Sequence, residues 1–322
     1  MEQQAITVNE ATDANGLQLT QIPVPSPGPG QLLVKIAATG VNFIETYQRS
    51  GVYKVDYPFV PGSEFAGVVE QVGAGVQNFK IGDRVATASG LAGYSEYALV
   101  DAALTGKVPD AVDLHVAAAL PLQGMTAHYL VHSSYMVHNG DVILTYAGAG
   151  GVGLILTQLL KLKGATVITT ASTQEKKDLA KAAGADYVVD YDQVAETVQK
   201  VTAGKGVNAV YDGIGKDTFE TSLAALRRRG TLVLFGGASG QVPPFDLQRL
   251  NAGGSLTVTR PKLNDFLTSE QEMHWRFGDM VGWVATGQID VRIGAQYPLV
   301  EANAAHTALE SRSTTGKVIL IP

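Results

Sequence analysis

The chain has 322 residues, 45% of them hydrophobic and 17% charged, which is enough apolar material for about two globular domains and excludes general disorder. A net charge of −6 argues against nucleic acid as the main partner, and the absence of cysteine excludes disulfides, thiolate catalysis and thiolate-bound metal centres. We see neither a secretory signal nor an uninterrupted apolar run of about 18 residues, so we expect a cytoplasmic protein with no membrane partner.

The first third of the chain is expected to form short strands separated by glycine and proline. A Pro/Gly-rich turn at 23–30 precedes an apolar run at 32–38, and a second strand-like run follows at 65–72. Gly82 and Asp83 then form a turn signal ahead of another strand. Short, evenly spaced strands are typical of a compact, barrel-like β unit.

Near residue 120 the pattern changes to strands that alternate with helices. This alternation indicates a parallel sheet with right-handed crossovers, in a doubly wound domain of the size of one nucleotide-binding fold. The expected strands are 142–147, 165–170, 187–189, 209–212 and 232–235, and the expected helices include 152–162 and 174–183.

The last part of the chain combines a long helix with a final strand. The helix is expected to begin at Ser269, with Glu272 completing a capping box, and to stop at Gly287. The apolar segment 316–321 is expected to form a strand that must pair with another strand, and we expect it to pair with the N-terminal β unit. The segment 255–259 has the pattern of an edge strand.

The strongest chemical signal is the segment Ala147-Gly148-Ala149-Gly150-Gly151-Val152-Gly153, between an expected strand and an expected helix. In this pattern the first glycine permits the tight turn, the second lets the backbone approach a pyrophosphate, and the third allows close packing of helix on strand. Backbone amides and the helix dipole then face the phosphates, although a plain strand–helix turn is the alternative. The residues expected to bind the dinucleotide here are Gly148, Gly150, Gly151, Val152 and Gly153.

The next strand indicates which dinucleotide binds. An NAD site usually carries an acidic residue about 20 positions after the loop, but residues 169–173 read Thr-Thr-Ala-Ser-Thr. The Ser172 hydroxyl and the Lys176 ammonium would suit a 2′-phosphate. In a second interpretation Ser172 and Glu175 form a capping box and the lysines are solvated; both interpretations can hold together. We therefore expect the cofactor to be NADPH.

Several further segments are specific only in combination. They include Thr39-Gly40-Val41-Asn42-Phe43, Pro61-Gly62-Ser63-Glu64 and the stretches 29–31, 47–53, 79–86, 258–261 and 309–312. Through these segments and the glycine loop, essentially the whole chain resembles the zeta-crystallin-like NADPH:quinone oxidoreductases, in the zinc-free branch of the medium-chain dehydrogenase/reductase superfamily. The resemblance implies an α/β fold with a GroES-like β-barrel catalytic domain (1–122 and 262–322) and a Rossmann domain with a doubly wound parallel sheet (123–261).

The sequence departs from the zinc-dependent branch at the metal site. Where zinc alcohol dehydrogenases carry a cysteine ligand this chain has Asn42–Phe43, and where they carry Gly-His-Glu it has Gly62-Ser63-Glu64. His128 and His132 share one helix face, but no third ligand is evident. We therefore expect no metal.

Without a metal, the expected acceptor is one that already accepts hydride, namely a quinone or another electrophilic carbonyl compound, while the protein supplies positioning. By resemblance, Asn42 and Tyr47 lie near the nicotinamide and Tyr53 lines the substrate slot, where a tyrosine hydroxyl could donate to the developing oxyanion. A simple wall residue is an equal interpretation for Tyr53, and Glu45 is not expected to be a general base. Further cofactor-binding positions implied by the resemblance are Thr126, Tyr191, Phe235, Gly236, Arg260 and Lys317.

Three questions stay open at this stage. The slot could instead take an enone, an alkenal or an enoyl thioester, because these substrates need the same scaffold. A protein of another class, a non-catalytic nucleotide- or RNA-binding crystallin-like protein, is disfavoured by the acidic balance. For Arg260, an interdomain salt bridge is the alternative. By resemblance, we expect a homodimer formed through the edge strand 255–259.

Overall fold

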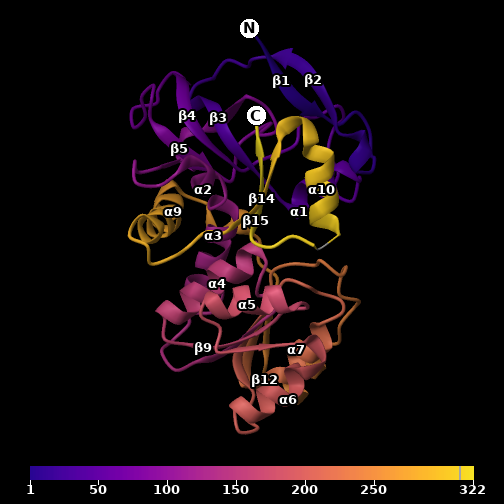
Figure 1. Ribbon diagram of the computed structural model, residues 1–322. Helices are drawn as coiled ribbons and strands as arrows, with labels where there is room; N and C mark the ends of the chain where they lie inside the picture. Colours follow the sequence, from indigo (N-terminus) through magenta and orange to yellow (C-terminus); the bar gives the residue numbers. More distant parts are fainter. Residues whose placement is uncertain (312) are drawn as a thin grey trace. The chain divides into compact units, whose positions relative to one another are not determined.

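The computed structural model describes residues 1–311 and 313–322, which form two compact units (Figure 1). The first unit contains Met1–Met125 and Leu267–Pro322, and the second contains Thr126–Phe266. Residue 312, at the end of the segment 309–312 that contributed to the family resemblance, lies outside the described residues.

The first unit is built on a seven-stranded sheet with the order β14-β15-β3-β4-β5-β7, in which β6 also pairs with β3. Apolar side chains from β3 to β6 form one core, and a second core lies under helix α10, which packs along β14 and β15 (Figure 1). A separate hairpin pairs β1 (Glu2–Thr7) with β2 (Gln18–Pro23). The sheet strands are β3 (Gln31–Val41), β4 (Phe65–Val72), β5 (Arg84–Thr87), β6 (Tyr97–Asp101), β7 (Gly106–Lys107), β14 (Ile293–Pro298) and β15 (Lys317–Ile321).

Within residues 1–311 and 313–322, five α-helices accompany this sheet, and one of them positions residues of the candidate site. Helix α1 begins directly after β3, and Asn42, whose backbone is still extended, is its N-cap. The helices are α1 (Phe43–Arg49), α2 (Leu114–Ala118), α3 (Pro121–Tyr129), which runs on into the second unit, α9 (Glu270–Ala285) and α10 (Ala302–Glu310).

The final strand returns to the N-terminal part of the chain, as the sequence predicted. Strand β15 runs antiparallel to β3, with Val318 opposite Val41 and Leu320 opposite Thr39. Continuing this register by one residue places Lys317 beside Asn42, although 275 positions separate them in the chain. The pairing therefore brings a C-terminal ammonium group to the start of α1.

The second unit contains a six-stranded sheet in the order β10-β9-β8-β11-β12-β13, and every neighbouring pair is parallel. This confirms the predicted doubly wound fold. Helix α4 packs beside α5, and α6 beside α7. The elements are β8 (Val142–Thr145), α4 (Gly151–Leu162), β9 (Thr166–Thr170), α5 (Gln174–Ala182), β10 (Tyr187–Val189), α6 (Val194–Val201), β11 (Val207–Asp212), α7 (Phe219–Ala225), β12 (Leu226–Leu234), α8 (Gln248–Ala252) and β13 (Thr257–Thr259).

The predicted capping box of α5 is wrong by one residue. The N-cap is Thr173, whose Oγ1 accepts a hydrogen bond from the Lys176 backbone N–H at 3.3 Å. Ser172 therefore lies before the helix, on the surface, and the third helical position belongs to Lys176 instead of Glu175. Because the cap is threonine, the Ser172 hydroxyl is not needed to begin the helix.

The long C-terminal helix begins where the sequence predicted but uses only half of the capping box. The Ser269 Oγ accepts from the Glu272 backbone N–H at 3.1 Å, whereas the Glu272 carboxylate accepts from the Thr268 backbone and hydroxyl. Gly287, with a φ of 71°, follows the helix end and confirms the predicted stop. No helix within the described residues has the length and apolar character needed to cross a lipid bilayer.

Candidate functional site

The glycine loop joins β8 to α4, and the space available for a side chain differs among Gly148, Gly150 and Gly153. Gly150 is the N-cap of α4, where a Cβ would meet only the Ala147 carbonyl oxygen, at 3.3 Å. A Cβ on Gly153 would lie 2.3 Å from that same oxygen, so the first helical turn packs directly on the loop backbone. The tight turn that the sequence assigned to Gly148 is made by Ala147, whose φ is 54°. Gly148 is needed instead because a Cβ would lie 2.5 Å from Thr169 Oγ1 on β9.

The amide groups of the loop divide into two sets. The N–H of Gly148 donates to the Thr170 carbonyl at 2.9 Å, and that of Gly150 donates to the Ala147 carbonyl at 2.9 Å. The amides of Gly151 and Val152 belong to the first turn of α4, where a helix leaves its N–H groups without intrahelical acceptors. These two amides, at the positive end of the helix dipole, are the ones suited to a phosphate.

The end of β9 supports the loop and leads to the proposed 2′-phosphate residues. Thr170 Oγ1 accepts from the Ala147 backbone N–H at 3.2 Å, so this hydroxyl holds the loop. The Lys177 ammonium lies 2.7 Å from the Asp190 carboxylate. The Lys177 ammonium therefore has the Asp190 carboxylate as its ion-pair partner. Next to Asp190, the half-exposed Tyr191 ring stacks on Tyr146 with 5.8 Å between centroids.

A buried polar cluster lies in the first unit where β3 meets α1. The Lys317 ammonium donates to Asn42 Oδ1 at 2.5 Å and forms an ion pair with Glu64 Oε2, and Asn42 Nδ2 donates to the same carboxylate oxygen at 3.0 Å. The second Glu64 oxygen accepts from the Leu122 backbone N–H at 2.7 Å. Lys317 and Glu64 are fully buried, and Asn42 is 6% exposed. The cluster is therefore a buried ion pair that is hydrogen-bonded to the side-chain amide of Asn42.

Glu45 lies beside this cluster on the first turn of α1. Its Oε2 accepts from the Asn42 backbone N–H at 2.8 Å, whereas its Oε1 has no hydrogen-bond partner among residues 1–311 and 313–322. Burial raises the pKa of Glu45 from 4.5 to about 7, an effect that the Lys317 charge partly offsets. Its contact is with the backbone N–H at the helix start, which is the role of a cap.

Tyr47, on α1, and Tyr53, which follows this helix, form an aromatic pair. Their ring centroids are 5.4 Å apart with 63° between the planes, and the Tyr53 N–H donates to the Tyr47 carbonyl at 3.0 Å. Phe43 stacks on Tyr47 at 6.2 Å. The Tyr53 side chain is half exposed, which suits a residue that meets a ligand.

The remaining predicted positions belong to the second unit. Thr126 is buried, and Phe235 and Gly236 follow β12. A Cβ on Gly236 would lie 2.4 Å from the Gly213 carbonyl oxygen, so the loops after β11 and β12 touch each other there. Arg260 is exposed, and its guanidinium donates to the Pro261 carbonyl at 3.4 Å.

Sequence reasoning missed Asp212, at the end of β11. Its buried carboxylate accepts from the backbone N–H groups of Ile214 and Gly215 at 2.8 and 3.0 Å, and from the hydroxyls of Thr218 and Ser222. These bonds fix the loop after β11 against α7. The available signal was an acidic residue at a strand end followed by glycines and then by hydroxyl residues six and ten positions later.

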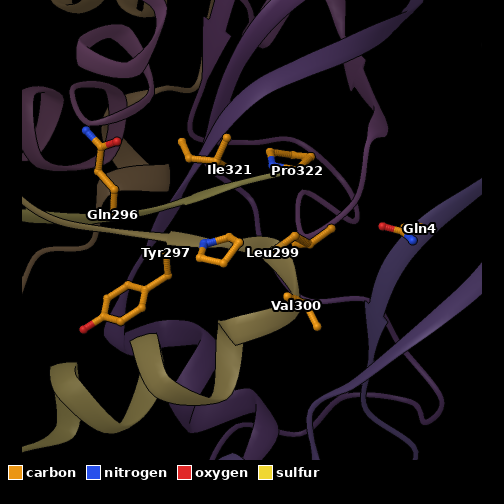
Figure 2. Close-up of a pocket in the computed structure, with 8 residues that line it drawn as sticks. Gln4, Gln296, Tyr297, Leu299, Val300, Ile321 and Pro322 are labelled. Carbon is orange, nitrogen blue, oxygen red and sulfur yellow. The ribbon is translucent and has the colours of Figure 1, made fainter.

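A surface pocket of about 390 Å³ lies elsewhere in the first unit, at the end of β14 (Figure 2). Figure 2 shows Gln296 and Tyr297 projecting to opposite sides of the strand, with Gln4 across the hollow. The side chains that line the pocket are uncharged. In the part of the chain that the structure describes, no three His, Asp or Glu side chains are arranged to hold a metal ion.

Comparison with known proteins agrees with this architecture. Residues 28–139 match the family model described as the alcohol dehydrogenase GroES-like domain, and residues 151–275 match the one described as zinc-binding dehydrogenase. The chain is 43% identical to a quinone oxidoreductase of Pseudomonas aeruginosa, over 92% of each chain, and 41% identical to a 2-haloacrylate reductase of a Burkholderia species, over 94% of each. A solved mycobacterial protein in complex with NADPH is 50% identical, with a TM-score of 0.96 over 99% of this chain and 100% of that one.

A GroES-like β unit together with a dinucleotide-binding unit that carries a glycine loop defines a medium-chain dehydrogenase/reductase. Within this superfamily, the chain belongs to the zeta-crystallin-like quinone oxidoreductases. The family predicted from the sequence motifs is thereby confirmed.

Proposed function

We propose that the protein is an NADPH:quinone oxidoreductase, which transfers hydride from NADPH to a quinone. The observation that carries the proposal is the loop between β8 and α4: the Gly151 and Val152 amides lie in the first turn of α4, where N–H groups have no intrahelical acceptor and could bind a pyrophosphate. The similarity to a mycobacterial protein in complex with NADPH and to quinone oxidoreductases supports the choice of cofactor and acceptor.

The residues of the chain would bind and orient the two reactants. When bound, the cofactor supplies the hydride, and one further proton completes the hydroquinone. Ser172 and Lys176 would hold the 2′-phosphate. Asn42 and Tyr47 would contact the nicotinamide, and the Tyr53 hydroxyl would donate a hydrogen bond to the acceptor oxygen as negative charge develops on it.

Steady-state and stopped-flow measurements of NADPH oxidation test this proposal. We expect 1,4-benzoquinone to be reduced with a higher kcat/KM than a small alkenal or an enoyl thioester. The 41% identity to a 2-haloacrylate reductase favours a second candidate, the reduction of electrophilic alkenes. A higher kcat/KM for 2-haloacrylate than for every quinone tested would select that candidate and reject the first.

The preference for NADPH is expected to depend on Lys176. Replacing Lys176 with alanine removes one charge-assisted phosphate contact, so KM for NADPH should rise about 10- to 100-fold while KM for NADH changes little. Lys177→Ala is the matched control, because Lys177 is paired with Asp190 at 2.7 Å and should affect the two cofactors equally. Equal effects of Lys176→Ala on both cofactors would remove its phosphate role.

We also propose that the protein is a homodimer and that it lies in the cytoplasm, where NADPH is supplied. Strand β13 is the edge of the parallel sheet in the described residues. The strand begins at Thr257, two residues later than predicted, because Ser255 has a φ of 59° and belongs to the turn. An open edge can pair with its counterpart in a second copy. Light scattering should give about twice the 33.8 kDa mass, and a monomer at micromolar concentration would contradict the dimer.

A further inference from the structure

The hydrogen-bonding chemistry around Asn42 permits one orientation of its side-chain amide. A lysine ammonium can only donate, so the atom facing Lys317 at 2.5 Å must be the carbonyl Oδ1. An ionised carboxylate can only accept, so the atom facing Glu64 at 3.0 Å must be Nδ2. The ion pair thus fixes the amide from both sides and excludes the flipped arrangement.

This arrangement leaves one group of Asn42 for a ligand. One Nδ2–H is bound to Glu64, and the second has no protein partner within residues 1–311 and 313–322. Withdrawal of electrons by the Lys317 ammonium at Oδ1 makes the amide N–H groups stronger donors. A polarised donor with a fixed amide orientation is therefore present at the residue expected to meet the nicotinamide.

The backbone around the cluster is shaped to admit the ion pair. A Cβ on Gly40 would lie 2.2 Å from Glu64 Oε2 and 2.7 Å from Lys317 Cε. The Gly40 N–H and the Thr39 hydroxyl both donate to the Glu64 carbonyl, at 2.8 and 2.7 Å. Glu64 is therefore held through its backbone as well as its side chain, and its position does not depend on Lys317 alone.

We propose that Lys317 and Glu64 are positioning residues of the redox reaction, which act through Asn42 by fixing its amide so that the second Nδ2–H faces the bound reactants. This inference rests on the proposed function. It replaces the expected direct contact of Lys317 with the cofactor, because the buried ammonium is directed to Asn42 and Glu64.

A mutant cycle tests this inference. The proteins are the wild type, Asn42→Ala, the charge-free pair Lys317→Met/Glu64→Gln, and the combination of all three changes. The charge-free pair avoids leaving a lone charge in the core, so it is the variant that should fold. We expect it to lower kcat for benzoquinone about 10- to 100-fold in the wild-type background and less than about twofold in the Asn42→Ala background. Equal fold losses in both backgrounds would overturn the inference.

Two further measurements separate positioning from folding and from the function itself. NADPH affinity, measured by fluorescence titration on the same four proteins, should change less than about threefold, because the phosphates bind elsewhere. Arg276→Met is the control: it removes a buried cation that forms an ion pair with the partly exposed Glu272 on α9, and it should leave kcat unchanged. If the wild type does not reduce quinones, the proposed function is wrong. If the wild type reduces quinones but the charge-free pair lowers kcat equally in both backgrounds, only the positioning role of Lys317 and Glu64 is wrong.

Discussion

Replacing Lys317 with methionine is expected to lower the free energy of unfolding by about 3–5 kcal/mol, because it leaves the buried Glu64 carboxylate without its cationic partner. Lys317 and Glu64 are both fully buried, so neither solvent nor salt can compensate for the lost partner. The methionine side chain fills a similar volume, so little of this loss would come from a cavity. Urea-induced unfolding of the two proteins would measure the difference.

Two comparisons isolate the charge as the cause. Adding Glu64→Gln to Lys317→Met removes the unpaired charge and should recover part of the loss. Lys107→Met breaks an ion pair with Asp83 in the same unit, but the Lys107 side chain is 56% exposed, so it should cost at most about 1 kcal/mol. If Lys317→Met costs no more than Lys107→Met, the buried pair does not have the energetic role assigned to it.

The parallel sheet was predictable because its signals are local. Strands β8 to β11 are short, mainly apolar segments, whereas β12 begins at Leu226, six residues before the predicted start at 232, because the charged residues 227–229 are part of the strand. The exact first residues of β13 and α5 depend instead on local backbone conformation and on helix capping. The left-handed conformation of Ser255 shortens β13, and the threonine cap at Thr173 moves the start of α5 by one residue. Neither feature has a distinctive pattern in a single sequence.

The candidate site was predictable only in part, for the same reason. The glycine loop is continuous in sequence, so the motif and its context could be recognised together. The cluster of Asn42, Glu64 and Lys317 forms only because β15 pairs with β3. From the sequence alone, a lysine at the start of a strand suggests an exposed residue, and nothing local indicates that it is buried against a glutamate.

A second buried network, around His306, predicts how stability depends on pH. The Arg49 guanidinium lies 3.0 Å from His306 Nδ1, and Tyr94 Oη lies 3.0 Å from Nε2. Since arginine can only donate, Nδ1 must accept, and the ring proton belongs on Nε2, facing Tyr94. Arg49 in turn pairs with Glu310 at 2.6 Å. Burial, together with the Arg49 charge, lowers the pKa of His306 from 6.5 to about 3, so the folded protein keeps this ring neutral.

The pKa shifts of His306 and Glu45 act on stability in opposite directions. Between pH 6.5 and 3 the unfolded chain binds a proton at His306 that the folded protein does not bind, so this contribution to stability is lost as the pH falls. Between pH 7 and 4.5 the folded protein holds a proton on Glu45 that the unfolded chain releases, so this contribution is lost as the pH rises. Between about pH 6.5 and 4.5 the two contributions oppose each other.

Single substitutions are expected to reveal the two slopes separately. His306→Gln keeps an acceptor and a donor but cannot titrate, so the stability advantage of the wild type over this variant should shrink by about 1.4 kcal/mol per pH unit below pH 6.5. The advantage over Glu45→Gln should instead grow by about 1.4 kcal/mol per unit as the pH falls from 7 to 4.5. Urea unfolding at half-unit steps of pH measures both. Equal slopes of the same sign for the two variants would show that His306 is protonated in the folded protein, contrary to the tautomer that Arg49 imposes.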